Sequence, residues 1–482
     1  MDNKGKEVSN LELRYIDVDT LKISSEALKL IPMDISRRYS ILPFKIAQDK
    51  LQLISAEDLN AYAIEELKFI SKKKIEAFKG DKEKVLNLIY KNYEVKEAQE
   101  TVYKLNEAED NKNQLVKKEN LNSPIIKILN YLITEAILKK SSDIHLEPNN
   151  HNVTIRFRID GVLYRVQEIP KNIFNQITIR IKILSNLDIT EKRIPQDGKF
   201  EYKANSKTYD IRVSSMPTIY GEKLALRILY KDSENISLSK LGFDNKGIQL
   251  IKSFLNIPYG MILVTGPTGS GKTTTLYSMI NEIDKEHKNI ITIEDPVEYY
   301  VKDINQINVS NKTGLTFTTG LKSILRQDPD VILVGEIRDE ETAQIAVRAA
   351  ITGHLVFSTL HTSDIASSIL RLLDMKVPPY LVSDALVGII SQRLVRKLCS
   401  HCKDMGNREE ECPYCNGTGY SGRTVIYEAI KIDENHKKII ATNFSIDEFN
   451  KYNTSLHHVP LKENALSLVK LGVTSLNEVK KV

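Results

Sequence analysis

The chain has 482 residues, a formal net charge of +5 and 41% hydrophobic residues. This length predicts about three domains, and the small net charge gives no support to a nucleic-acid-binding protein. No apolar run approaches the ~18 residues that a membrane-spanning helix needs. The first ten residues also lack the apolar stretch of a signal peptide. We therefore expect a cytoplasmic protein that associates with a membrane only through partners.

Residues 1–92 predict a small N-terminal α/β domain. Its sequence contains no nucleophile motif, metal-ligand cluster or phosphate loop, which favours a docking domain over a ligand site. Residues 93–122 are rich in Lys, Glu, Asn and Gln, and this composition predicts a flexible linker. Within the domain, helices are predicted over 31–39, 59–69 and 82–90, and strands over 41–44 and 50–54.

Residues 123–232 predict an α+β domain. It begins with a helix whose apolar residues recur on one face between Ile125 and Ile133. The polar face of the predicted sheet carries arginines such as Arg156 and Arg158, and the sequence leaves open whether they form only a solvated face. Alternating strands are predicted over 153–160, 162–166, 210–214 and 223–229, with hairpin turns at 160–161 and 195–199.

A phosphate-binding loop opens the next domain. After a short linker over 233–240, residues 241–482 predict an α/β domain, in which the apolar run 261–264 is a buried strand. The strand, glycine-rich loop and helix are the context that a P-loop needs. Glycines allow successive N–H groups to point at phosphate oxygens, and the helix N-terminus adds its partial charge. The predicted nucleotide-binding residues here are Gly266, Pro267, Thr268, Gly269, Ser270, Gly271, Lys272, Thr273 and Thr274.

Two of these P-loop side chains have a chemical role of their own. Lys272 is expected to contact the β- and γ-phosphates during catalysis, and the Thr273 hydroxyl is expected to bind Mg²⁺. The motif therefore predicts ATP and Mg²⁺ as cofactors.

Carboxylates follow two further buried strands, 290–293 and 331–334. In a parallel α/β sheet, ligands bind at the carboxyl ends of strands. Glu294, Asp295 and Glu298 follow the first strand, and Glu336 follows the second after Gly335. Such carboxylates can orient or deprotonate the attacking water, or hold Mg²⁺ through water. We favour Glu298 as general base and Glu336 for the Mg²⁺ and water role, although the sequence does not decide between the two glutamates.

A third strand is predicted over 353–362, with a histidine near each end, His354 and His361. Beside the γ-phosphate, such polar residues can sense whether the phosphate is present. A structural role for either histidine is the alternative.

The four cysteines form two CxxC pairs. In a reducing compartment this clustering indicates metal rather than disulfides. Four thiolates can close a tetrahedral, structural Zn²⁺ site, and His401 is not expected to replace a ligand. Four free thiols are the alternative. The predicted zinc ligands of this insert, 399–415, are Cys399, Cys402, Cys412 and Cys415.

These motifs together resemble those of the type II secretion and type IV pilus assembly ATPases. The resemblance covers nearly the whole chain, and its motifs occur in the family's order. It implies a P-loop (RecA-like) ATPase domain preceded by the α+β domain and the small N-terminal α/β domain. The matching motifs lie at 142–148, 156–161, 195–198, 210–212, 266–273, 292–298, 320–330, 335–339, 353–361 and 392–396.

The resemblance implies a homo-hexameric ring with ATP between the two domains that follow the linker. It also implies arginines that reach the nucleotide, and the matching positions are Arg212, Arg227, Arg326 and Arg423. A guanidinium neutralises charge on phosphoryl oxygens in the transition state. Lys322 stands where the family pattern has Arg, so a role for Lys322 is in doubt.

The resemblance further implies a motor that assembles a type IV pilus or a type II secretion pseudopilus. The cysteine knuckle is expected to contact an inner-membrane platform protein. A cytoplasmic-domain partner of the same machine is also expected, with the ATPase attached at the inner face of the cytoplasmic membrane. The family's retraction motors usually lack the long N-terminal domain and the knuckle, which favours assembly. A DNA-uptake pseudopilus motor stays open.

Two alternatives belong to other classes of protein. A nucleic-acid translocase on the same P-loop core should carry a strongly basic, aromatic surface, which the sequence does not predict. A regulator that binds a cyclic dinucleotide should open with an Arg-Leu-Gly-type repeat, which residues 1–60 lack. The segment from 428 to 482 has helical patterns but no predicted site.

Overall fold

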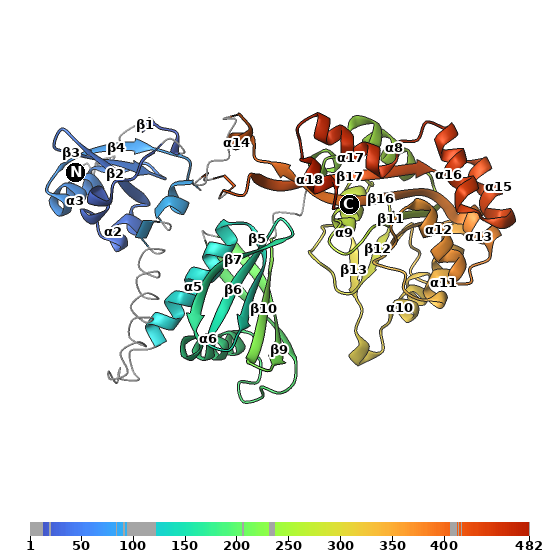
Figure 1. Ribbon diagram of the computed structural model, residues 1–482, viewed down its shortest axis with the longest axis horizontal. Helices are drawn as coiled ribbons and strands as arrows, with labels where there is room; N and C mark the ends of the chain where they lie inside the picture. The colour runs from blue at the N-terminus through green and yellow to red at the C-terminus, as the bar shows by residue number, and fades with distance from the viewer. Residues whose placement is uncertain are drawn as a thin grey trace, which may run out of the picture. The chain divides into compact units, whose positions relative to one another are not determined.

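The structure is a computed structural model that describes residues 13–18, 21–82, 84–89, 92–93, 122–204, 207–230, 237–404, 412, 414–415 and 417–481. The chain forms two compact units, Met1–Tyr230 and Lys231–Val482, and each is described by itself (Figure 1). Apart from residues 93 and 122, the predicted linker over 93–122 lies outside the described residues.

The N-terminal domain is built on a four-stranded sheet. Its strand order is β1 (Arg14–Tyr15), β4 (Lys74–Lys79), β3 (Lys50–Ser55) and β2 (Ile41–Ala47). Only β2 and β3 are antiparallel. Its helices are α1 (Ser25–Lys29), α2 (Met33–Arg38) and α3 (Ala61–Ser71).

The helices of this domain begin at recognisable caps. Asn60 caps α3 by accepting a hydrogen bond from Ala63 N at 2.8 Å. Pro32 lies directly before α2, where its fixed φ fits and its missing N–H costs nothing. The third predicted helix is present over the described residues 84–89.

A six-stranded antiparallel sheet follows, in the order β7-β6-β5-β10-β9-β8 (Figure 1). Two helices, α5 (Asn122–Leu138) and α6 (Lys171–Leu184), pack on the sheet around one apolar core. Because strand residues alternate between faces, the other face bears the polar side chains. The strands are β5 (Ser141–Pro148), β6 (Asn152–Ile159), β7 (Val162–Pro170), β8 (Gln196–Ala204), β9 (Lys207–Thr218) and β10 (Gly221–Leu229).

The hairpin turn predicted at 195–199 is wrong. Gln196 begins β8, which pairs with β9 from Gln196 opposite Ser215 onward. Gly198, the glycine that suggested a turn, instead lets the backbone of β8 lie close to the Ser185 carbonyl. A Cβ at this position would come within 2.5 Å of Ser185 O.

The P-loop domain contains a seven-stranded sheet in the order β13-β12-β14-β15-β11-β16-β17. All neighbouring strands are parallel except β16 and β17. The central strands are buried on both faces, as parallel sheets require. The strands are β11 (Gly260–Thr265), β12 (Ile290–Glu294), β13 (Asn305–Asn308), β14 (Val331–Val334), β15 (Leu355–Leu360), β16 (Leu386–Leu398) and β17 (Tyr420–Lys431).

Helices cover both faces of this sheet. On β11, Met261 and Leu263 join one apolar cluster, while Ile262 and Val264 join the other. The first cluster includes α10 (Phe317–Ile324), α11 (Glu340–Ile351), α12 (Ile365–Asp374) and α13 (Pro379–Ala385). The second includes α7 (Leu238–Leu241), α8 (Asn245–Leu255) and α9 (Lys272–Asn281). Since buried Leu238 belongs to this core, the domain begins within the stretch that was predicted as the linker 233–240.

The C-terminal segment packs beside the strands that lead to the cysteines. Arg396 on β16 donates from Nη2 to Glu478 Oε1 at 2.8 Å, and its guanidinium lies 4.0 Å from the ring centre of Tyr420. The hydrogen bond from Arg396 lowers the pKa of Glu478 to about 2. The remaining elements are η4 (Asn311–Thr313), α14 (Ser400–Asp404), α15 (Glu434–Asn443), α16 (Ile446–Ser455), α17 (Leu461–Lys470) and α18 (Leu476–Val479).

Within the described residues, every helix is too short or too polar to cross a membrane.

Candidate active site

The P-loop connects β11 to α9 at the carboxyl edge of the sheet. Gly269 and Gly271 adopt φ values of 79° and 87°, which side-chain-bearing residues rarely tolerate, and α9 begins at Lys272 directly after them. Gly271 stands at the N-cap position of α9. The loop therefore presents backbone N–H groups and a helix N-terminus, the arrangement that binds phosphate.

Lys272 lies folded into its own loop. Its Nζ donates hydrogen bonds to the carbonyl oxygens of Gly266 at 2.8 Å and Pro267 at 3.1 Å. Burial lowers the pKa of Lys272 to about 8, and the nearby charge of Glu336 opposes that shift. Phosphate oxygens can replace these two carbonyl oxygens as hydrogen-bond acceptors. The ammonium group of Lys272 therefore already lies in the loop where the phosphates of a nucleotide would bind.

Gln392 on β16 contacts the backbone of the P-loop. Its Nε2 donates to Ser270 O at 2.8 Å, and a Cβ on Gly266 would come within 2.5 Å of Gln392 O. Among the residues that the structure describes, the Ser270 hydroxyl and Gln392 Oε1 are buried without hydrogen-bond partners, so each can still bind a polar group of a ligand or a water. Sequence reasoning noted Gln392 only within a family motif, because no local pattern links it to a loop 122 residues away.

Glu336 lies next to the P-loop lysine. It pairs with Arg338 Nη2, and His361 Nε2 lies 3.3 Å from its Oε2. Burial alone would raise the pKa of Glu336, but the hydrogen bond and charge of Arg338 outweigh it and keep the pKa low. Glu336 therefore remains a carboxylate, as the Mg²⁺ and water role requires.

Glu294 is buried, with 3% of its surface exposed. The Tyr277 hydroxyl donates to Oε2, and Thr292 Oγ1 donates to Oε1 at 2.6 Å. Burial raises the pKa of this carboxyl. These contacts join the P-loop helix to β12. A direct contact between Glu294 and the nucleotide remains a prediction.

Asp295 and Glu298, the other carboxylates that follow β12, are more exposed than Glu294. Asp295 is exposed, with Oδ2 4.0 Å from Arg338 Nη1, and Glu298 is half-buried farther along the same loop. The choice of Glu298 as general base remains a prediction.

The two histidines lie at opposite ends of β15. His361 follows β15 at the edge that carries the P-loop, since Leu360 is opposite Thr265. His354 precedes β15 and donates through Nδ1 to Ala349 O at 2.9 Å. Because β15 has six residues of about 3.3 Å each, His354 is placed far from the P-loop of its own chain.

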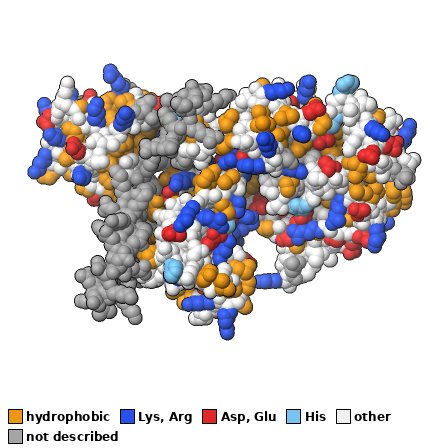
Figure 2. All heavy atoms as spheres, in the orientation of Figure 1, with side chains coloured by type: hydrophobic (Ala, Val, Ile, Leu, Met, Phe, Trp, Pro, Cys, Tyr) orange, Lys and Arg blue, Asp and Glu red, His pale blue; other side chains and the backbone are white. Residues whose placement is uncertain are grey.

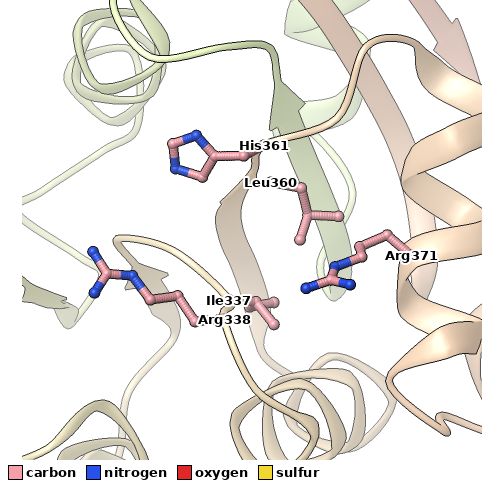
Figure 3. A pocket seen from close by; sticks show the side chains of 5 residues that line it. All are labelled: Ile337, Arg338, Leu360, His361 and Arg371. Atoms are coloured by element: carbon pink, nitrogen blue, oxygen red, sulfur yellow. The ribbon is translucent and has the colours of Figure 1, made fainter.

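A pocket of about 480 Å³ is lined in part by Arg338 and His361, the two side chains that contact Glu336. Ile337 and Leu360 form its apolar part, while Arg338, His361 and Arg371 contribute nitrogen atoms (Figure 3). Arg371 comes from α12 and was not predicted. This lining gives the P-loop edge a cationic side pocket.

The predicted arginines lie on separate elements. Arg227 on β10 donates from Nε to Asp143 Oδ1 at 3.0 Å, and Arg212 lies directly opposite it on β9. Arg326 is exposed after α10, and Arg423 is exposed on β17. Their roles at the nucleotide remain predictions.

The Lys322 side chain binds within its own domain. Its Nζ donates to Glu341 Oε1 on α11 at 2.5 Å, which joins α10 to α11. This exposed ion pair gives Lys322 a role within the domain that does not involve the nucleotide.

The four cysteines come together as predicted. Their sulfur atoms all lie within 4.8 Å of one another, with 3.9 Å between Cys399 and Cys412 and 3.5 Å between Cys402 and Cys415. Tetrahedral zinc with bonds of about 2.3 Å requires sulfurs about 3.8 Å apart. The cluster is therefore compatible with zinc, which would close this insert as a structural ion.

Replacing Cys399 by Ser is expected to remove the zinc. The wild-type protein should hold about one zinc per chain, and the variant close to none with a lower folded fraction. Metal analysis and thermal unfolding provide the measurement. His401→Ala is the matched control, because His401 lies between two ligands yet packs on the Tyr414 ring. Fresh wild-type protein without zinc would contradict the assignment.

Comparisons with known proteins agree with this geometry. The family model described as "Type II/IV secretion system protein" matches residues 118–481, and the MshEN domain model matches residues 11–99. The type IV pilus assembly ATPase PilB of Myxococcus xanthus is 37% identical and covers 96% of this chain and 88% of that protein. The type II secretion system ATPase E of Vibrio cholerae is 40% identical over 75% of each chain.

Solved structures show the same fold. The pilus retraction motor PilT with bound ADP aligns with a TM-score of 0.53 and 30% identity, over 73% of this chain and 96% of that one. The predicted fold class, a RecA-like P-loop domain preceded by an α+β domain, is confirmed.

Proposed function

The chain belongs to the type II/IV secretion system family of ATPases, and we propose that it hydrolyses ATP within a hexameric ring to power assembly of a type IV pilus. One observation favours the pilus over secretion. The pilus assembly relative from Myxococcus xanthus matches 96% of the chain, whereas the type II secretion ATPase from Vibrio cholerae matches 75%. A type II secretion or DNA-uptake pseudopilus motor is the second candidate.

Binding of the nucleotide falls to the P-loop. Backbone N–H groups of 266–274 would bind the phosphates, and Lys272 would exchange its two carbonyl acceptors for phosphate oxygens. Thr273 and the carboxylate of Glu336 would hold a magnesium ion, which would neutralise charge on the β- and γ-phosphates when bound. Glu298 would accept the proton of the attacking water.

Arginine side chains would stabilise the transition state of ATP hydrolysis. Their guanidinium groups neutralise charge on phosphoryl oxygens only when the site is closed. Arg212 and Arg227 would reach the nucleotide from the α+β domain, and Arg326 and Arg423 from the P-loop domain. His361, beside Glu336, would sense the γ-phosphate.

The remaining parts are proposed to connect the ring to its machine. Residues 1–92 would dock a cytoplasmic-domain partner, 93–122 would act as a linker, and the zinc knuckle would contact an inner-membrane platform protein. The protein would then lie at the inner face of the cytoplasmic membrane through partners. A nucleic-acid translocase has no support, because the net charge is only +5.

Arg227→Ala is expected to lower ATP turnover at least 100-fold while ATP affinity stays within about threefold, since the guanidinium acts in the closed transition state. Phosphate release and titration with a fluorescent ATP analogue measure the two quantities. Arg165→Ala is the matched control, because its side chain is 63% exposed, against 61% for Arg227, and it pairs with Glu168 at the sheet edge. Unchanged turnover in Arg227→Ala would remove the proposed role.

A further inference from the structure

A row of charged side chains crosses five strands of the six-stranded sheet. Directly opposite residues share a face and lie with their Cβ atoms about 5 Å apart. Lys and Arg side chains gather over this sheet in Figure 2, with acidic side chains among them. From β6 to β8 the row consists of Arg158, Asp143, Arg227, Arg212 and Lys199. Asp143 is the single carboxylate among four cations.

Among the described residues of the domain, Arg227 is bound through only one of its guanidinium nitrogens, Nε. Its Nε donates to Asp143 Oδ1 at 3.0 Å, yet the side chain is 61% exposed. Within the described part of the chain, its terminal nitrogens Nη1 and Nη2 have no hydrogen-bond partner. A guanidinium held through Nε presents its two terminal amino groups outward, which is the fork that binds two phosphoryl oxygens.

Two neighbouring arginines are held differently. Arg156 donates from Nη2 to Glu147, and Arg158 donates from Nη1 to Gly161 O at 2.9 Å. In both, a terminal nitrogen is already engaged within the domain. The free fork therefore distinguishes Arg227 from these two.

Asp143 is itself fixed in place. Its side chain is 12% exposed, Ser142 Oγ donates to its Oδ2 at 2.8 Å, and Arg158 Nε lies 3.6 Å from the same oxygen. Without this carboxylate, Arg227 would lie directly opposite Arg212 with no compensating charge on its other side, and opposed like charges repel.

We propose that Asp143 is a positioning residue for ATP hydrolysis, which holds the Arg227 guanidinium by Nε so that its terminal nitrogens face the phosphates of ATP. This inference rests on the proposed role of Arg227. Asp143 does not contact the nucleotide. It fixes the orientation of an exposed side chain that otherwise samples many rotamers, and it keeps Arg227 from moving away from Arg212.

The test compares two carboxylates on one strand. Asp143→Ala is expected to lower kcat about tenfold and Asp143→Asn about threefold, since asparagine keeps an acceptor for Nε but loses the charge. The affinity for ATP should stay within twofold. Glu147→Gln is the control, because Glu147 lies four residues along β5 on the same face and binds Arg156 and Lys223 instead. Its kcat should stay within twofold.

A double variant separates positioning from a general effect on the sheet. Asp143→Asn combined with Arg227→Ala should turn over no more slowly than Arg227→Ala alone, because the carboxylate acts through that arginine. A further threefold loss in the double variant, or an equal loss in Glu147→Gln, would overturn the proposal. Thermal unfolding and hexamer size are measured for each variant, and a kcat loss shared with a loss of folded protein also counts against it.

The outcomes also distinguish this inference from the proposed function. If Arg227→Ala is slow and both Asp143 variants are normal, the positioning role fails and the arginine role stands. If Arg227→Ala itself is normal, the role of the arginine fails, and the inference fails with it.

Discussion

Lys272→Ala is expected to abolish ATP turnover, with a fall of at least 1,000-fold, which corresponds to roughly 4 kcal/mol of transition-state stabilisation. The lysine is the buried cation of the P-loop, and its Nζ is already held among the oxygens of that loop. Alanine would leave the glycine backbone free to bind phosphate, but it would remove the charge that we propose to contact the β- and γ-phosphates. Turnover is measured by phosphate release at saturating ATP.

A lysine elsewhere in the same domain controls for general effects. Lys252→Ala removes an exposed lysine of α8 that pairs with Glu282 at 3.0 Å. It should leave turnover within twofold, since exposed ion pairs contribute little to stability. Hydrolysis at the wild-type rate by Lys272→Ala would refute the assignment of the P-loop.

Glu336→Gln is expected to lower kcat about 100-fold or more while the protein still binds ATP. Arg338 keeps the pKa of this carboxyl low, and glutamine would lack the charge that we propose to hold the water shell of Mg²⁺ and to polarise the attacking water. The variant should also need more Mg²⁺ for half-maximal turnover. Quench-flow and equilibrium binding of labelled ATP measure chemistry and binding separately.

Two other glutamates sharpen this experiment. Glu298→Gln tests the preferred general base, and it should slow hydrolysis without changing the Mg²⁺ requirement. Glu341→Gln is the control, because Glu341 is exposed on α11 and pairs with Lys322. Normal turnover and an unchanged Mg²⁺ requirement in Glu336→Gln would remove Glu336 from the site.

The buried strands of the P-loop domain could be predicted because parallel strands covered on both faces are continuous apolar runs. The predicted strands at 261–264, 290–293 and 331–334 lie within β11, β12 and β14. The P-loop itself follows from glycine spacing, and the zinc cluster from cysteine spacing. These signals are local, so a single sequence contains them.

Contacts between distant residues could not be predicted in the same way. Asp143 and Arg227 are 84 residues apart, and only the register of β5 and β10 brings them together. Likewise, the hydrogen bond that the Tyr277 hydroxyl of α9 donates to Glu294 was not predicted from the sequence. Both cases depend on packing between elements, which no local pattern encodes.

Glycine had two physical uses that sequence reasoning did not separate. In the P-loop, Gly269 and Gly271 provide positive φ, and the sequence predicted a glycine-rich loop there. At Gly198 the same residue type instead makes room for Ser185 O, so a strand was mistaken for a turn. Sequence alone does not tell which use applies.

Whether this ATPase powers pilus assembly can be measured in cells of the source organism in which Glu336→Gln replaces the native protein. Surface filaments are imaged and secreted protein is assayed in the same cultures, with Glu341→Gln as the control strain. We expect the Glu336→Gln strain to lose its pili while secretion stays intact. Excess pili would indicate retraction, and normal pili with lost secretion or DNA uptake would place the motor in another machine, so either result would contradict the account.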